Sequence, residues 1–200
     1  MKYIFLLVSL VSFTVSGQKK AIINEVKKHQ EEQNMLFKTK ETSPLKEENR
    51  KAFTGLDFFD INLKYRVKAT LQRTPQASFF KMKTTTSRVS EERVYGVVTF
   101  VLEGKEHKLN VYQGKQLMTQ KGYEDYLFLP FFDKTNGYST YGGGRYLDLR
   151  IPDGNTIIID FNKAYNPYCS YNERYSCPIV PNDNYVNVLI EAGVKAYKKH

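Results

Sequence analysis

Residues 63–72 read LKYRVKATLQ, and apolar and polar side chains alternate along the whole stretch. A period of two residues indicates a β-strand with one buried face. Similar runs follow at short intervals, separated by turn signals and by no helical pattern. The expected strands span residues 63–72, 79–85, 94–102, 106–112, 126–132, 145–151, 156–161 and 185–190. The last could also be a short helix, and its β-branched residues favour a strand. This succession predicts a mainly β protein with short N-terminal helices, folded as an antiparallel β-sandwich or a partly closed β-barrel.

The composition is typical of a single globular domain. Of the 200 residues, 41% are hydrophobic, which is enough for a packed core and excludes a wholly disordered chain. We expect residues 57–200 to form the β domain and residues 18–56 to form a helical segment packed on it. Within that segment we expect helices over residues 19–37 and 44–53, the second with Ser43 as its N-cap.

The first 17 residues have the pattern of an export signal. Lys2 supplies a positive charge, residues 3–14 are apolar, and Val15-Ser16-Gly17 offers small residues at a cleavage site. About twelve apolar residues are too few to cross a bilayer of roughly 30 Å, and no other apolar run is long enough. We therefore predict a cleaved signal peptide over residues 1–17, no membrane span and an exported, periplasmic or extracellular protein.

The charge balance bears on possible partners. The formal net charge is +9, and removal of the signal peptide lowers it only by the charge of Lys2. The chain has no continuous basic run of the kind typical of a nucleic-acid arm, so we expect no nucleic-acid partner. We also expect no cofactor. One basic face would form if the two strands that carry these residues paired: Lys64, Arg66, Lys68, Lys81 and Lys83. It would suit an anionic polymer of the cell envelope, or it is an ordinary solvated face.

The predicted compartment bears on the chemical state of the two cysteines. Cys169 and Cys177 are separated by seven residues in a loop-like stretch. In an oxidising compartment two such cysteines are expected to form a structural disulfide. Their spacing matches neither a Cys-x-x-Cys redox motif nor a zinc pair, so no metal site is expected.

The last predicted hairpin, residues 145–161, concentrates polar side chains. A three-residue loop at 153–155 aligns the apolar residues of both strands and places Asp148 directly opposite Asp160. Facing carboxylates repel, so a cation, a shared proton or an arginine should compensate. The expected polar pocket is built from Tyr146, Asp148, Arg150, Asp160 and Asn162. The alternative is a solvated face with an Arg–Asp network.

A run of three glycines, residues 142–144, precedes Arg145. The backbone N–H groups of Gly143 and Gly144, together with the Arg145 guanidinium, could bind an anionic group. The alternative is a glycine-permitted bend at the entrance of a strand. The three histidines, at positions 29, 107 and 200, lie near no nucleophile motif and are expected on the solvated surface.

Several of these stretches resemble one known family. The run YGGGRYLDL at 141–149 is followed by DFNKAYNPYC at 160–169 and by Cys177-Pro178. Together they are similar to the family called domain of unknown function 1684, and the similarity covers most of the mature chain. The resemblance implies no chemistry, but it draws attention to Arg145, Asp148, Asn162 and Asn166.

These observations favour an exported module that binds a small molecule or an anionic ligand. The expected ligand-binding residues are Gly143, Gly144, Arg145, Tyr146, Asp148, Arg150, Asp160, Asn162, Tyr165 and Asn166. One alternative is a hydrolase of envelope glycan that uses Asp148 and Asp160 as its catalytic carboxylates. Another is a structural envelope protein that uses the basic face.

Overall fold

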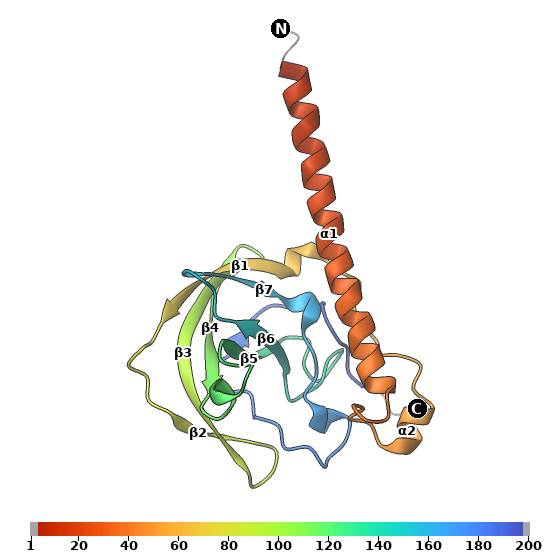
Figure 1. Ribbon diagram of the computed structural model, residues 1–200, viewed down its shortest axis with the longest axis vertical. Coiled ribbons are helices and arrows are strands. Elements are labelled where there is room, and N and C mark those ends of the chain that lie inside the picture. Colours follow the sequence, from red (N-terminus) through yellow and green to blue (C-terminus); the bar gives the residue numbers. More distant parts are fainter. Residues whose placement is uncertain (1–3, 198–200) are drawn as a thin grey trace.

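The computed structural model describes residues 4–197, with side chains from Gly17 onward. The predicted signal peptide, residues 1–17, falls almost entirely outside the described side chains. Eight strands surround the main core (Figure 1). They are β1 Arg66–Arg73, β2 Phe80–Lys83, β3 Val89–Leu102, β4 Lys105–Gly114, β5 Tyr126–Asp133, β6 Arg145–Arg150, β7 Thr156–Asp160 and β8 Tyr185–Val186. The sequence predicted all eight positions, although the last strand is shorter than expected.

The strands form one sheet in the order β6-β5-β4-β3-β1-β7, with β2 added to β3 and β8 added to β5. Every pairing is antiparallel except that of β8 with β5. The sheet curls into a half-barrel, and long β3 and β4 follow this curvature (Figure 1). The expectation of a mainly β, single-domain, partly closed barrel is confirmed.

The two faces of the sheet bury different sets of side chains. On β5, Leu127, Leu129 and Phe131 are completely buried in the main core inside the curl. Their neighbours Tyr126 and Phe128 project from the other face, because successive strand residues point in opposite directions. A second apolar cluster therefore lies outside the curl, and it forms the base of the candidate site.

Two α-helices precede the sheet: α1 Ile4–Lys38 and α2 Glu47–Lys51. The second half of α1 packs on the body of the protein through the buried side chains of Val26 and Phe37. The predicted N-cap at Ser43 is wrong, because α2 begins at Glu47 and the Ser43 hydroxyl accepts from Leu45 instead. Among the residues whose side chains are described, no helix is both long enough and apolar enough to cross a membrane.

Short 3-10 helices complete the fold. They are η1 Leu63–Tyr65, η2 Leu117–Thr119, η3 Phe161–Lys163 and η4 Tyr168–Ser170. The last two belong to the segment that follows β7. This segment returns across the outer face of the sheet toward α1, so it covers the second apolar cluster.

The predicted hairpin register of residues 145–161 is wrong. β6 pairs with β5 and β7 pairs with β1, so these two strands lie at opposite ends of the sheet order. Asp148 is opposite Phe128 and Asp160 is opposite Arg66. The apolar alternation did fix which side chains point into the core. That alternation is equally compatible with either neighbour, so it could not fix the pairing.

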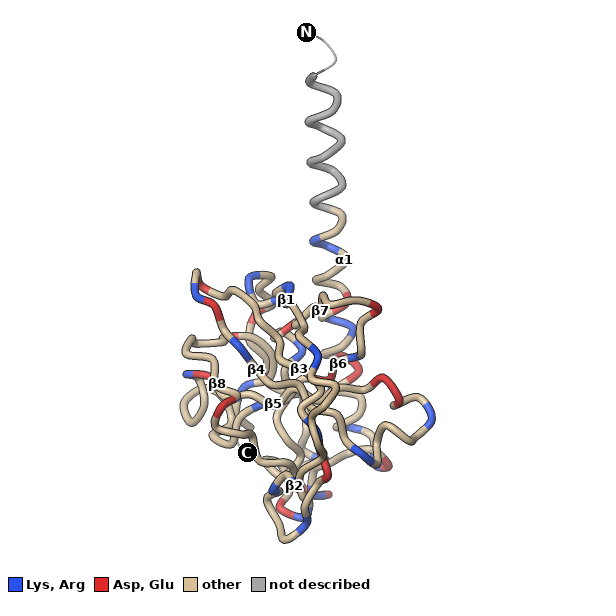
Figure 2. The backbone as a smooth tube through the Cα atoms, turned by 90° about the vertical axis from the view of Figure 1, so that its left-hand side faces the viewer, with Lys and Arg blue, Asp and Glu red and all other residues tan. Residues whose placement is uncertain are grey.

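The predicted basic face is also wrong, because β1 does not pair with β2. The neighbours of β1 are β3 and β7, and Lys81 on β2 lies opposite Glu91 on β3. Lys64 forms an ion pair with Glu103. Figure 2 shows basic and acidic residues interspersed along the strands. These five basic residues therefore do not lie on one pair of neighbouring strands.

Candidate functional site

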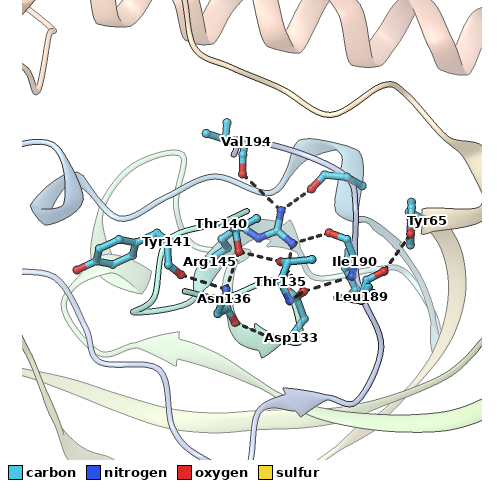
Figure 3. Close-up of polar contacts among 11 residues, drawn as sticks. Tyr65, Asp133, Thr135, Asn136, Thr140, Tyr141, Arg145, Leu189, Ile190 and Val194 are labelled. Atoms are coloured by element: carbon cyan, nitrogen blue, oxygen red, sulfur yellow. Dashed lines mark hydrogen bonds and ion pairs between the residues drawn. The ribbon is translucent and has the colours of Figure 1, made fainter. Parts of the chain in front are cut away.

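Arg145 lies in the protein interior and not at a ligand site. Its side chain is completely buried, and its guanidinium donates to the Asp133 carboxylate at 2.8 Å (Figure 3). The same guanidinium donates to the backbone carbonyls of Ile190, Ala192 and Val194. The expected anion contact is therefore wrong, because the protein itself already occupies the donors on both terminal nitrogens.

The glycine run before Arg145 allows a tight backbone turn. Gly144 has a φ of +84°, which favours glycine, and its N–H donates to the carbonyl of Tyr141. A Cβ at Gly144 would also lie 2.8 Å from the carbonyl oxygen of Phe131. The alternative reading, a bend at the entrance of a strand, agrees with this geometry. Gly143, in the same turn, has the ring of Tyr141 directly beside it.

Asn162 and Asn166 hold backbone segments together. Asn162 accepts from the N–H of Asn62 and donates to its carbonyl, so it fixes the entry to η1. The Asn166 amide donates to the carbonyl of Lys195 and to the Tyr171 hydroxyl. Both asparagines are 1% exposed, so neither reaches a ligand.

Asp148 and Asp160 both border one cavity, although they do not face each other as a strand pair. This seam cavity, of about 470 Å³, lies between the edges of β6 and β7 and extends beneath α1. Asp160 is buried and ion-paired with Arg66 at 2.7 Å, and it accepts further hydrogen bonds from Asn162. Arg150 pairs with Asp125, also at 2.7 Å.

A second and larger cavity, of about 560 Å³, lies on the outer face of the sheet. We call it the tyrosine cavity. Its floor comes from β3 to β6, and one wall comes from His29, Gln33 and Leu36 of α1. The rest comes from the β4–β5 connection and from the segment after β7. Its aromatic lining consists of Tyr123, Tyr126, Phe128, Tyr146, Tyr165, Tyr168 and Tyr175.

Asp148 lies where the two cavities adjoin. The hydroxyls of Tyr126 and Tyr165 both donate to its Oδ1, at 2.7 and 2.5 Å. Burial and the adjacent Asp148 charge raise the pKa of both tyrosines, so their hydroxyls stay protonated and keep donating. The other oxygen, Oδ2, has no hydrogen-bond donor among the described residues. Asp148 is an exposed residue, so one carboxylate oxygen is held by two tyrosine hydroxyls and the other is open to solvent.

Glu92 is a second carboxylate in the tyrosine cavity. It lies opposite Gly114 in the β3–β4 pairing, and its side chain is only 7% exposed. Ser90 donates to Oε1 at 2.5 Å, whereas Oε2 is buried without a hydrogen-bond partner among the described residues. Burial raises the pKa of Glu92, against the opposing effects of Ser90 and the charge of Arg88. A Cβ at Gly114 would come within 3.1 Å of this carboxylate, so the glycine makes room for it.

Two histidines are less exposed than expected. His29 is half-buried on α1 and borders both cavities. Burial lowers the pKa of His29, and the charge of Lys163 adds to that effect. His107 is 8% exposed and stacks near Phe100. The expectation of solvated surface histidines is wrong for both, and His200 lies outside the described residues.

The two cysteines lie side by side near the tyrosine cavity, and Cys177 borders it. Both are free thiols in the structure, and the backbone N–H of Cys169 lies 3.2 Å from the sulfur of Cys177. The hydrogen bond from the Cys177 thiol lowers the pKa of Cys169 to about 6. The same interaction raises the pKa of Cys177, and burial adds to the rise. The predicted disulfide stays a prediction.

Three of the expected ligand residues line the tyrosine cavity: Tyr146, Asp148 and Tyr165. The seam cavity is lined by four: Asp148, Arg150, Asp160 and Tyr165. Sequence reasoning missed Glu92, because the strand was expected to begin only at residue 94, and it placed His29 on the surface. Among the described residues, no cluster of three or more histidine, cysteine or acidic side chains could hold a metal ion.

Comparison with known proteins gives a family and a fold but no activity. The family model described as "Protein of unknown function (DUF1684)" matches residues 51–195, which confirms the resemblance seen in the sequence. A solution NMR structure of an uncharacterized protein from Haloarcula marismortui is 29% identical, with a TM-score of 0.71. The match covers 92% of this chain and 99% of that one. No curated protein matches the chain.

Proposed function

The chain belongs to the DUF1684 family of proteins of unknown function, and we propose that it is a binding module that holds a small organic molecule in the tyrosine cavity. One observation carries the proposal: a cavity of about 560 Å³ has an aromatic lining and two carboxylates, and Oε2 of Glu92 is buried there without a hydrogen-bond partner. Such a volume is typical of ligand pockets, which span roughly 300–1,000 Å³ and combine aromatic walls with a few polar groups. Export remains part of the proposal and is supported by the pattern of residues 1–17.

The anionic ligand expected from the sequence loses its support. Arg145 is engaged inside the protein, and none of the described residues that line the tyrosine cavity is Lys or Arg. The charged groups that do line it are acidic. We therefore favour a ligand that is neutral or positively charged.

The two alternative functions are supported less well. The glycan hydrolase required a working pair of carboxylates, but Asp160 is ion-paired with Arg66 and only Asp148 has an oxygen available. A structural envelope protein would need the predicted basic face, but β1 and β2, which were expected to form it, are not paired in the sheet. Each alternative can be tested separately. A glycan hydrolase should turn over an envelope glycan, and a structural envelope protein should bind an anionic polymer in a salt-sensitive way.

A cavity-filling variant tests the proposal. Gly114→Leu puts a side chain on the floor of the tyrosine cavity, beside Glu92. Gly154→Leu is the matched control, because nothing lies within 4 Å of a Cβ at that turn. The three proteins are screened by ligand-observed NMR against one library of cationic, neutral and anionic fragments.

We expect a set of fragments that binds the wild type and the Gly154 variant but not the Gly114 variant. Circular dichroism and unfolding curves first establish that both variants are folded. The proposal fails if no fragment binds the wild type, or if the Gly114 variant binds the same fragments with unchanged affinity.

A further inference from the structure

Two carboxylate oxygens of the tyrosine cavity lack a hydrogen-bond donor among the described residues. Asp148 accepts both tyrosine hydroxyls at Oδ1, which leaves Oδ2 without one. Glu92 accepts from Ser90 at Oε1, and its Oε2 is buried without a partner. A buried acceptor without a donor destabilises a fold, so Oε2 of Glu92 indicates a ligand that brings a donor. Asp148 is exposed, so it adds to the same cavity a carboxylate that solvent can reach.

The aromatic rings favour positive charge at the same place. A cation is attracted to the negative face of an aromatic ring. The guanidinium carbon of Arg150 lies 5.7 Å from the ring centroid of Tyr123 and 5.9 Å from that of Tyr126. Both rings line the tyrosine cavity and Arg150 does not, so these contacts show that the two rings accept a cation but not that one lies in the cavity. No Lys or Arg among the described lining residues supplies a positive charge from inside.

We propose that the ligand is an organic ammonium with at least one N–H donor, held by Asp148, Glu92 and the tyrosine rings. This inference rests on the proposed function and narrows it to one class of ligand. A quaternary ammonium would gain from the rings but would leave Oε2 of Glu92 without a donor. A neutral polyol would supply donors without the charge, and an anion would be repelled by the carboxylates.

The surroundings of Glu92 make the inference sensitive to pH. Arg88 and Ser90 stabilise its charged form, and Gly114 on the neighbouring strand contributes no charge. Burial outweighs these effects and raises the pKa of Glu92. An ammonium beside Oε2 favours the ionised carboxyl, so ammonium affinity should rise as pH increases through this raised value.

The other titratable groups of the cavity are His29, Asp148, Cys177 and the tyrosines. Loss of a proton from His29 would also favour a cation, so the wild-type pH profile alone does not identify Glu92. Glu92→Gln removes only the contribution of this carboxyl. We therefore expect this variant to show a shallower rise of affinity with pH than the wild type.

Three four-carbon probes test the charge class at constant size: 1,4-diaminobutane, 1,4-butanediol and succinate. Binding is followed by calorimetry and by the ring resonances of labelled tyrosines. We expect the diamine to bind at least about tenfold more tightly than the diol, and succinate not to bind. Asp148→Asn and Glu92→Gln should each weaken diamine binding by roughly tenfold. Asp153→Asn is the control, because this exposed turn residue lines neither cavity.

The ammonium inference is overturned if the diol binds as tightly as the diamine, if both variants bind the diamine normally, or if the diamine does not bind. The fragment screen with Gly114→Leu decides separately whether the cavity binds small molecules. Neutral fragments that bind there, together with a diamine that does not, would keep the proposed function and reject the ammonium.

Discussion

Arg145 donates a hydrogen bond to the Asp133 carboxylate at 2.8 Å, and both side chains are completely buried. The pair joins the start of β6 to the end of β5. The Arg145 guanidinium also reaches the carbonyls of residues 190–194, so it fastens the C-terminal segment to the sheet (Figure 3). Arg145, which the sequence analysis placed in an anion-binding site, therefore stabilises the fold instead.

Replacement of this arginine should destabilise the protein strongly. Arg145→Met leaves the Asp133 carboxylate buried without its counter-ion, and the expected loss is about 3–5 kcal/mol of unfolding free energy, measured by urea denaturation. Arg150→Met is the control, because its ion pair with Asp125 is more than half exposed and should contribute about 0–1 kcal/mol. Equal losses for the two variants would contradict the structural role of Arg145.

Glu92 should make the protein less stable as pH rises. A carboxyl whose pKa is raised by folding binds its proton more tightly in the folded state than in the unfolded state. Its effect on stability is therefore most favourable below the ordinary value of 4.5 and declines as pH rises through the raised value. The unfolding free energy of Glu92→Gln, relative to wild type, should increase between acid and neutral pH.

Glu25 should change the stability of the protein with pH in the opposite direction. Its hydrogen bond with Lys163 lowers its pKa, so this carboxyl stabilises the folded state above its ordinary pKa and loses that effect in acid. Glu25→Gln should therefore fall in stability, relative to wild type, over the same increase of pH. The assignment is wrong if the two variants show slopes of the same sign.

The cysteine pair should form a disulfide in an oxidising compartment. Intact-mass measurement of the exported protein should show the loss of two hydrogens, and reduction should lower the unfolding free energy by about 2.5 kcal/mol for so short a loop. In the reduced protein, Cys169 should react with iodoacetamide faster than Cys177 at neutral pH, because its pKa is lowered to about 6. Alkylation of Cys177 first would contradict the hydrogen-bond assignment.

The strand positions were predictable because each strand carries its own evidence in alternating apolar residues. Leu147 and Leu149 point into the core, as the pattern required. The neighbours of a strand are not encoded in that pattern, because the inward residues of β6 and β7 fit a hairpin and a curled sheet equally well. In the structure the sheet curls along the long strands β3 and β4, and β6 and β7 pair with β5 and β1 instead of with each other (Figure 1).

The candidate site was predictable only in part, and for a similar reason. Tyr146, Asp148 and Tyr165 lie near each other in the chain, and a local argument brought them together. Glu92 reaches them only through the order of four neighbouring strands, β3 to β6. His29 lies on α1, and the local sequence does not indicate where this helix packs on the sheet.

The most direct test of the central claim is the position of a bound ligand. The chain has 15 tyrosines and no tryptophan, so ring-labelled tyrosine gives a simple NMR spectrum. Tyr126→Phe and Tyr165→Phe assign two cavity resonances. A fragment from the screen should shift these two resonances saturably and leave exposed Tyr138 unchanged. Saturable shifts confined to tyrosines outside the cavity would contradict the claim that this cavity is the binding site.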